Sequence, residues 1–335
     1  MDGRDKPDHD NPDTKRESGN AGMLSYFIRR VLATIPVIGM VAFFVFSLLY
    51  LTPGDPAAVI AGDIATNEDI ERIRNKLGLD QPFLTRFGTW AWGVLQGDLG
   101  ISIFTNLPVT QLIGQRIEPT LSLALCTLIV SVLVAVPLGV IGAWKVGKFV
   151  DRLVMLFSVL GFSIPVFVFA YILIYVFAIQ LDWLPVQGYV PFREGFWLWL
   201  RQLILPSIAL GTIYIALIAR ITRATMLDVL AQDYVRTAHA KGLAPNAVLM
   251  QHALKNAAVP IVTIIGIGIA LLISGVVVTE SVFAIPGIGR LTVDAILRRD
   301  YPVIQGVILL FSVLYVVVNL LVDLSYRLFD PRIQY

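Results

Sequence analysis

Six long stretches of uncharged, apolar residues constrain the fold of this chain more than any other feature. Each is long enough to cross the bilayer core as a helix, which takes about 20 residues. A spanning segment must satisfy its own backbone hydrogen bonds, and stretches of this length without alternation favour helices over barrel strands. We therefore predict an all-α, polytopic membrane protein with six transmembrane helices. The stretches are Val31 to Leu51, Thr120 to Trp144, Leu153 to Ile179, Gln202 to Ala219, Asn256 to Thr279 and Val303 to Val322.

The composition agrees with this class of protein. Of the 335 residues, 56% are hydrophobic and 15% are charged, whereas about 25% are charged in soluble proteins. The formal net charge of +2 argues against a nucleic-acid partner. A single cysteine, Cys126, excludes intrachain disulfides and Cys-rich metal sites, and we interpret it as a small apolar helix residue.

The distribution of charge predicts the orientation. With the N-terminus in the cytoplasm, the inside segments after the tail sum to +7, the three outside loops to −3 and the tail to −2. The short turn from Lys145 to Arg152 is the informative one, because loops beyond about 60 residues, such as 52–118, say little about orientation. Both termini should then be cytoplasmic, with an external loop at about 52–118 and a long cytoplasmic segment at about 220–255.

Residues 1–22 form the N-terminal segment before the membrane domain 23–335. They are polar, rich in Asp, Pro and Gly, and free of aromatic residues, so they bury too little apolar surface to order themselves. We expect a disordered tail that can be removed, or a start of translation at Met23; the sequence favours neither.

The sequence lacks the motifs of several enzyme classes. The chain has no G-x-x-x-x-G-K-[ST] phosphate loop, no H-E-x-x-H and no G-x-S-x-G. We therefore expect neither an ATPase nor another enzyme, and no cofactor or metal. Ion-coupled transporters keep ionisable residues inside their spans, and the six stretches contain none. Glu280 and Asp323 lie just beyond span ends, where we interpret them as interfacial carboxylates in contact with water.

The cytoplasmic segment Arg220 to Lys255 is too long for a turn. Its composition predicts a helix from Thr225 to Lys241, which Gly242 ends, and a second short helix that Pro245 begins. Such a pair could dock into a groove of a soluble partner. An amphipathic connector on the membrane surface is the alternative, and composition alone favours that connector.

The same segment resembles a known family. Residues 233–242, DYVRTAHAKG, followed by 252–257, HALKNA, and Pro260, are similar to the E-A-A-x-x-x-G loop of ATP-binding-cassette importer permeases. More narrowly, they resemble the first permease of dipeptide and oligopeptide import systems, with their glutathione and nickel relatives. Arg236, Thr237 and Ala238 replace Glu-Ala-Ala, and Lys255 stands where the general pattern has Pro. Both departures are usual in the peptide branch.

Further short motifs extend the resemblance along nearly the whole chain from Met23. Each alone is typical of a solvated turn, and their order and spacing carry the resemblance. They are MLSYFIRR at 23–30, TPGDP at 52–56, LGLDQP at 77–82, QGDLG at 96–100, DWLP at 182–185, FAIPGIG at 283–289 and RDYP at 299–302.

The resemblance implies the MetI-like fold of type I importer permeases and a bacterial inner-membrane location. It implies that the cytoplasmic segment is a coupling helix that fits a cleft in an ATPase. It implies as partners a second homologous permease, two ATPase subunits or domains and an extracytoplasmic substrate-binding protein, besides membrane lipid. A secondary transporter and a non-transporting scaffold are the alternatives. The implied ATPase-coupling residues are Asp233, Tyr234, Arg236, Thr237, Ala238, Lys241, Gly242 and His252.

Other positions carry more than one interpretation. His239 is a surface helix residue, because no second metal ligand is near it in sequence. Asn67 to Leu77 should form a short amphipathic helix that caps the external face. The prolines within spans either kink the helices or are tolerated, and Gly266, Gly268, Ser274 and Gly275 permit close packing, which we expect against the partner permease. The hydroxyl residues that line a passage or serve helix packing are Ser163, Thr212, Tyr214, Thr263, Ser274 and Thr279.

The predicted topology has a direct test. Lys148 and Lys241 should face the cytoplasm, while Asp80 and Arg193 should face outward. Single cysteines at these four positions, labelled in intact cells with a membrane-impermeant reagent, should react only at 80 and 193. Labelling of Lys241→Cys from outside would contradict the orientation and the coupling interpretation together.

Overall fold

The computed structural model describes residues 12–51, 55–62 and 65–329, and within these ranges the secondary structure is helical apart from one isolated β-bridge between Ile101 and Pro108. Five helices are long and apolar enough to cross a membrane, or six spans result if one bent pair of helices counts as a single span. The all-α prediction is therefore confirmed for the described residues. The five helices are α1 (Pro12–Leu51), α6 (Ile117–Trp144), α9 (Phe196–Leu230), α12 (Lys255–Val282) and α14 (Tyr301–Phe329).

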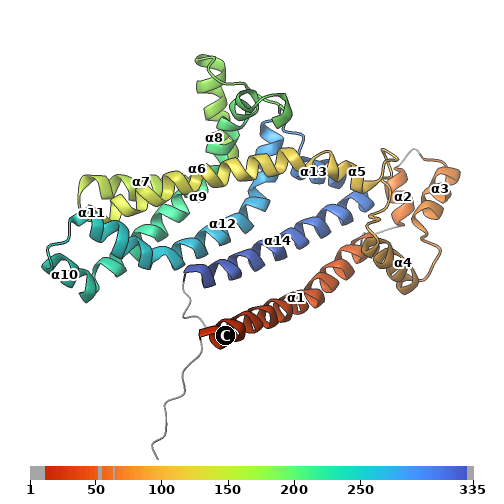
Figure 1. The fold of residues 1–335 in the computed structure, drawn as a ribbon. Helices are drawn as coiled ribbons and strands as arrows, with labels where there is room; N and C mark the ends of the chain where they lie inside the picture. Colours follow the sequence, from red (N-terminus) through yellow and green to blue (C-terminus); the bar gives the residue numbers. More distant parts are fainter. Residues whose placement is uncertain (1–11, 52–54, 63–64, 330–335) are drawn as a thin grey trace, which may run out of the picture.

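The third predicted span, Leu153 to Ile179, is bent at Pro165, one of the prolines for which we expected either a kink or a tolerated residue. Helix α7 (Phe149–Ser163) and α8 (Val166–Leu173), which continues into the π-helix η1 (Ile174–Gln180), meet at an angle of 106°. Ile164 comes directly before Pro165 and has extended backbone, with ψ 120. Proline disfavours helical geometry in the residue before it, which explains the break. In Figure 1, α8 leaves the bundle and points away from it. The prolines at 36, 137 and 206 lie inside continuous helices.

Helix α1 begins at Pro12, so the described helix includes residues 12–22, which we expected to be disordered. A helix that has already formed costs little to extend by further residues. Residues 1–11 lie outside the described residues. The assignment of 1–22 as a segment separate from the membrane domain remains a prediction.

Helices α6 and α9 make the most extensive contact in the structure. Gly139 of α6 lies so close to α9 that an added Cβ would be 2.6 Å from Thr222 Cβ and 2.7 Å from the carbonyl oxygen of Ala219. Gly161 of α7 is similarly close to α9, because an added Cβ there would be 2.9 Å from Ala216 Cβ. Inside a bilayer, helices associate through such close packing, since lipid is as apolar as their side chains.

The glycines of α12 also pack within the chain. A Cβ at Gly266 would overlap Val322 of α14, and one at Gly275 would lie 2.7 Å from Leu210 Cδ1 of α9. The close helix packing that we expected at these glycines is confirmed for both positions, and the neighbours are helices of the same chain instead of a partner permease. The side chain of Ser274 lies outside the described residues.

The segment between α1 and α6 forms a separate group of short helices. They are α2 (Pro56–Ala61), α3 (Asn67–Leu77), α4 (Phe83–Leu95) and α5 (Val109–Gly114), and Figure 1 places them at the end of the molecule opposite α10 and α11. The predicted bounds of α3 are confirmed. Thr66 caps α3, and its side-chain and backbone hydrogen bonds to Asp69 lower the pKa of that carboxyl group.

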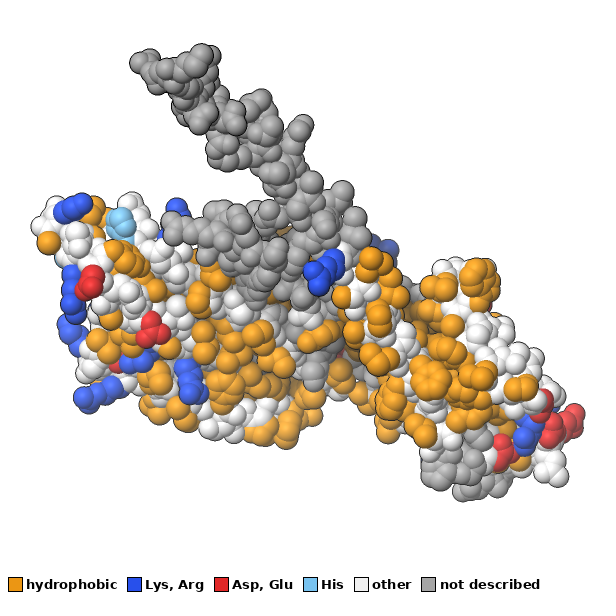
Figure 2. All heavy atoms as spheres, turned by 90° about the horizontal axis from the view of Figure 1, so that it is seen from below, with side chains coloured by type: hydrophobic (Ala, Val, Ile, Leu, Met, Phe, Trp, Pro, Cys, Tyr) orange, Lys and Arg blue, Asp and Glu red, His pale blue; other side chains and the backbone are white. Residues whose placement is uncertain are grey.

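The RDYP motif fastens this group to α14. Asp300 is buried and accepts hydrogen bonds from Ser102 Oγ at 2.5 Å and from the backbone N–H of Ile103 at 3.2 Å. Figure 2 shows hydrophobic side chains across the middle of the visible face, with most of the charged side chains at the two ends. This distribution suits a protein whose middle lies in lipid and whose ends meet water.

The contact between α6 and α9 predicts a pair of substitutions with opposite results. Gly139→Ala should destabilise the protein by about 1 to 3 kcal/mol, because the new methyl group forces packed helices apart. Gly39→Ala in α1 meets nothing within 4 Å and should leave stability unchanged or slightly raised, since Ala favours helix. Thermal unfolding of both variants in the same detergent measures the difference; equal melting temperatures would contradict the packing.

Candidate functional site

The candidate docking segment is a short helix held at one end of the bundle. The chain leaves α9 at Leu230, forms α10 (Asp233–Ala240), turns at Gly242 and returns through α11 (Pro245–Ala247) and the π-helix η3 (Val248–Leu254) into α12. The prediction of one helix from Thr225 to Lys241 was wrong, because Gln232 is extended with ψ 148 and breaks it. The second short helix is in fact continuous with α12.

Two apolar contacts explain this break. Met226, at the end of α9, is fully buried in a cluster with Val140 of α6 and Ala257 of α12. Val235 and Ala238 of α10 are buried against Val248 in a different cluster. A straight helix presents one continuous stripe, so the bend lets each stripe reach its own neighbours. Ala238, a predicted coupling residue, therefore packs inward.

The opposite face of α10 is polar and exposed. Side chains of Asp233 and Arg236 are 94% and 77% exposed and form an ion pair at 3.4 Å. An ion pair this exposed contributes little to stability, so both charges remain available to a partner. Tyr234, Thr237, His239 and Lys241 are also exposed, and the surface position predicted for His239 is confirmed.

The remaining predicted residue, His252, is half-buried in η3. Its carbonyl oxygen accepts a hydrogen bond of 2.7 Å from Asn256 Nδ2, which also donates to the Tyr234 hydroxyl at 3.0 Å. Asn256 thus links α10 to α12. Sequence reasoning assigned no role to Asn256, because only the return of the chain at Gly242 brings it near Tyr234.

Gly242 ends α10 in the predicted left-handed conformation, with φ 80. The N–H groups of Gly242 and Leu243 donate to the carbonyl oxygens of His239 and Ala238, at 2.9 and 3.3 Å. A Cβ at this position would meet nothing within 4 Å. The requirement for glycine is therefore set by the backbone conformation and not by space.

A buried ion pair fixes the neighbouring turn at the same end. Arg223 Nη2 of α9 lies 2.8 Å from Asp151 Oδ2 of α7, and the same oxygen accepts the N–H of Gly147 at 2.9 Å. The side chains are only 19% and 7% exposed. Such bidentate arginine contacts restrict geometry, so α7, its preceding turn and α9 form one base beneath the docking segment.

At the opposite end lies Glu280 of α12, which is fully buried. Its carboxylate accepts hydrogen bonds from Thr120 Oγ1 of α6 at 2.6 Å and from the backbone N–H of Arg290 at 2.9 Å. Our interpretation of Glu280 as an interfacial carboxylate in water was wrong, because the FAIPGIG turn folds back over it. The side chain of Asp323 lies outside the described residues.

The geometry at Glu280 makes it a cap for α13 (Ile288–Arg298). An added Cβ at Gly287 would overlap the carboxylate, and one at Gly289 would lie 3.0 Å from its Oε2. Thr120 Oγ1 accepts the N–H of Ile288 at 2.8 Å. A negative charge at a helix N-terminus is favourable, so Glu280 holds α6, α12 and α13 together. The glycines at 287 and 289 were the sequence feature that could have indicated this close contact.

Four of the six predicted passage residues hydrogen-bond within their own helices. The hydroxyls of Ser163, Thr212, Thr263 and Thr279 each donate to the carbonyl oxygen four residues earlier, and Tyr214 is buried.

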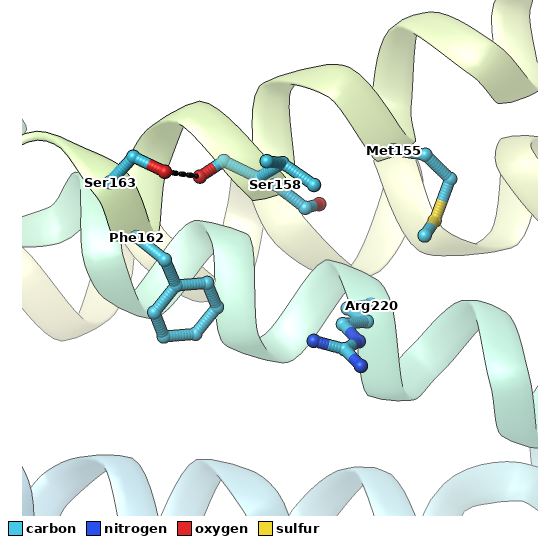
Figure 3. A pocket seen from close by; sticks show the side chains of 6 residues that line it. Met155, Ser158, Phe162, Ser163 and Arg220 are labelled. Atoms are coloured by element: carbon cyan, nitrogen blue, oxygen red, sulfur yellow. Dashed lines mark hydrogen bonds between the residues drawn. The ribbon is translucent and has the colours of Figure 1, made fainter.

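Ser163 also lines a hollow of about 350 Å³ between α7 and α9, beside Ser158, Phe162 and Arg220 (Figure 3). Among the described residues, no group of three or more His, Cys, Asp or Glu side chains could hold a metal ion.

Comparison with known families matches nearly all of the chain beyond residue 22. Residues 135–335 match the model of the binding-protein-dependent transport system inner membrane component, and residues 23–124 match the model of its N-terminal part. The chain belongs to this family. In this inner membrane component, the docking segment and Glu280 both lie in the larger matched region.

Related proteins cover almost the same length. A probable peptide ABC transporter permease protein, y4tP, of Sinorhizobium fredii is 58% identical over 92% of this chain and 99% of its own. The glutathione transport system permease protein GsiC of Escherichia coli O6:H1 is 42% identical over 93% of this chain and 100% of its own. An inward-facing structure of the MetNI methionine ABC transporter, at 17% identity, shares the fold with a TM-score of 0.54, covering 66% of this chain and 97% of that one.

The cap at Glu280 predicts a stability effect that sequence position alone does not suggest. Glu280→Gln should cost about 1 to 3 kcal/mol, because the amide N–H₂ must face the Thr120 hydroxyl or the Arg290 N–H and leaves a buried donor unpaired. Asp294→Asn, at an exposed acid of α13, is the matched control and should stay within about 0.5 kcal/mol. Thermal melting in detergent decides; an unchanged Glu280→Gln protein would contradict the cap.

Proposed function

We propose that this chain is the first of two permease subunits of an ATP-driven importer of short peptides, and that α10 docks into an ATPase subunit. The observation that carries the peptide assignment is the 58% identity to a probable peptide ABC transporter permease along 99% of that relative. The glutathione relative supports the same substrate range, since glutathione is itself a short peptide. The chain contains no phosphate loop, so partner subunits would hydrolyse the ATP.

The exposed face of α10 supports docking over a membrane-surface connector. A connector lying in the interface needs an apolar face turned toward lipid. On α10 the apolar residues Val235 and Ala238 are buried within the chain, and Tyr234 is the one large hydrophobic residue that is exposed. The exposed residues instead combine charge, hydroxyl and aromatic groups, which suits a soluble protein partner.

The packing of α10 supports a mechanism for coupling. Because α10 contacts η3 through Val235 and α12 through the Tyr234 to Asn256 hydrogen bond, a force on α10 would move α12 with it. The ATP-driven approach of two ATPase subunits would thus turn the permease pair outward, and hydrolysis would reset it. The face of α7 with the hollow beside Ser163 and Arg220 would contribute one wall of the passage.

The same proposal places the remaining partners. The end with α10 would face the cytoplasm, together with both termini, and the end with α2 to α5 would meet a substrate-binding protein outside. Selection of the peptide would be delegated to that binding protein. A secondary transporter is less favoured, because the buried Glu280 is engaged as a helix cap and the relatives are named as ABC or transport-system permeases.

Substitution at the end of α10 tests docking. Gly242→Val should strain the turn by about 1 to 2 kcal/mol and misdirect α10, so less ATPase should co-purify and substrate-stimulated ATP hydrolysis should fall. Gly62→Val is the matched control, because Gly62 also follows a helix with positive φ, at 84, and has open space around it, yet it ends α2 at the opposite end of the molecule. It should carry similar strain and retain the ATPase.

Charge reversal on the exposed face provides the second variant. Arg236→Glu should weaken docking while membrane abundance stays near normal, and Lys148→Glu, at the same end but outside α10, should have a smaller effect. Full co-purification and full stimulated hydrolysis in both Gly242→Val and Arg236→Glu would overturn the docking assignment and favour the membrane-surface connector.

A further inference from the structure

A pocket of about 470 Å³ lies at the end of the molecule opposite α10, where α1, α4, the segment Asp98 to Ile103 and the first turns of α14 meet. This volume falls in the range of sites for small molecules, about 300 to 1,000 Å³. Phe46, Trp90 and Tyr301 contribute aromatic surface to it. Its polar lining comes from Asn75, Gln81, Arg86, Thr89, Asp98 and Gln305.

Arg86 supplies a positive charge to this pocket. Its guanidinium carbon lies 5.4 Å from the ring centre of Phe46 and 5.2 Å from that of Tyr50, and it donates a hydrogen bond to the Tyr50 hydroxyl. No carboxylate of the described residues forms an ion pair with it. Stacking on two rings restricts the side chain, so Arg86 is positioned in advance to receive an anionic group.

Asp98 supplies the opposite charge in the same pocket. Its Oδ1 accepts the N–H of Gly100 at 2.8 Å, and the flanking Gly97 and Gly100 have φ of 85 and 87. This turn holds the carboxylate in place, and within the described part of the chain no Lys or Arg pairs with it. The QGDLG motif therefore leaves a fixed acid beside the pocket, where an ammonium group could bind.

Gln305 of α14 is the third observation. Its side chain lines the pocket, and the residue is only 6% exposed. A carboxamide both donates and accepts hydrogen bonds. Gln305 can therefore bind a polar group of a ligand in the pocket.

We propose that this pocket binds a small zwitterion, with its anionic group at Arg86, its ammonium group at Asp98 and a further polar group at Gln305. Two ligand sources share this chemistry, a short peptide and the head group of a zwitterionic phospholipid. The pocket is argued from its own charges and lies at the far end from α10, so it stands whether or not α10 docks an ATPase.

The experiment uses the assembled importer without its binding protein, in nanodiscs made only of phosphatidylglycerol. Equilibrium binding is measured for dialanine, its N-acetyl form and its C-terminal amide. Arg86→Gln should weaken the binding of dialanine at least about tenfold and leave the affinity for the C-terminal amide unchanged. Asp98→Asn keeps an acceptor for the Gly100 N–H. It should weaken the binding of dialanine similarly and leave the affinity for the N-acetyl form unchanged.

Matched controls come from the same loop. Arg72→Gln and Asp80→Asn remove exposed charges that do not line the pocket, and both should leave every affinity unchanged. Retained binding of the modified peptides shows that the variant pocket is folded. Co-purification of the ATPase is recorded in parallel, so that failure of this site is distinguished from failure of the docking proposal.

The lipid source has its own arm. Nanodiscs that contain phosphatidylethanolamine are washed with detergent, and the lipid retained by each variant is quantified by mass spectrometry. Selective loss of peptide binding supports the site with a peptide occupant. Absent peptide binding, with phosphatidylethanolamine retention lost in Arg86→Gln and Asp98→Asn, supports it with a lipid occupant. Equal effects on all forms of the peptide, or no effect on either ligand, would overturn the proposal.

Discussion

The close approach of α6 to α9 is the contact on which the rest of the structure depends. Lipid provides no hydrophobic drive for two apolar helices to associate, so contact must come from dense packing. Gly139 and Gly161 remove the side chains that would hold α6 and α7 away from α9. Helix α12 also packs against α9. These helices position α10 at one end of the molecule and the Glu280 cap at the other.

Three buried acids stabilise the two ends of the molecule through the same kind of hydrogen bonding. Taken as whole residues, Asp151, Glu280 and Asp300 are each at most 5% exposed, and each accepts at least one backbone N–H together with a side-chain donor. Charge near a membrane is costly unless it is paired or hydrogen-bonded. These acids therefore connect segments that are far apart in sequence. The RDYP motif contains Asp300, and the FAIPGIG motif folds over Glu280, so both motifs have a structural role beyond a solvated turn.

The docking segment combines rigidity with exposure. Its inner face is packed on η3 and linked to α12, while its outer face keeps charges that are almost fully solvated. In the proposed coupling, a partner would thus bind without breaking internal contacts, and motion of α10 would pass to α12. A loop without the Val235 and Val248 contact would absorb the same motion instead of transmitting it.

The sequence by itself determined the apolar helices, the bounds of α3 and the left-handed turn at Gly242, because length, capping residues and glycine act over a few neighbouring residues. Only the tertiary structure decided that the third span bends at Pro165, that α10 separates from α9, that Asn256 meets Tyr234 and that Glu280 is buried under its own turn. Each of these depends on residues brought together from distant parts of the chain. A local pattern states which surfaces a helix offers, and packing alone decides what covers them.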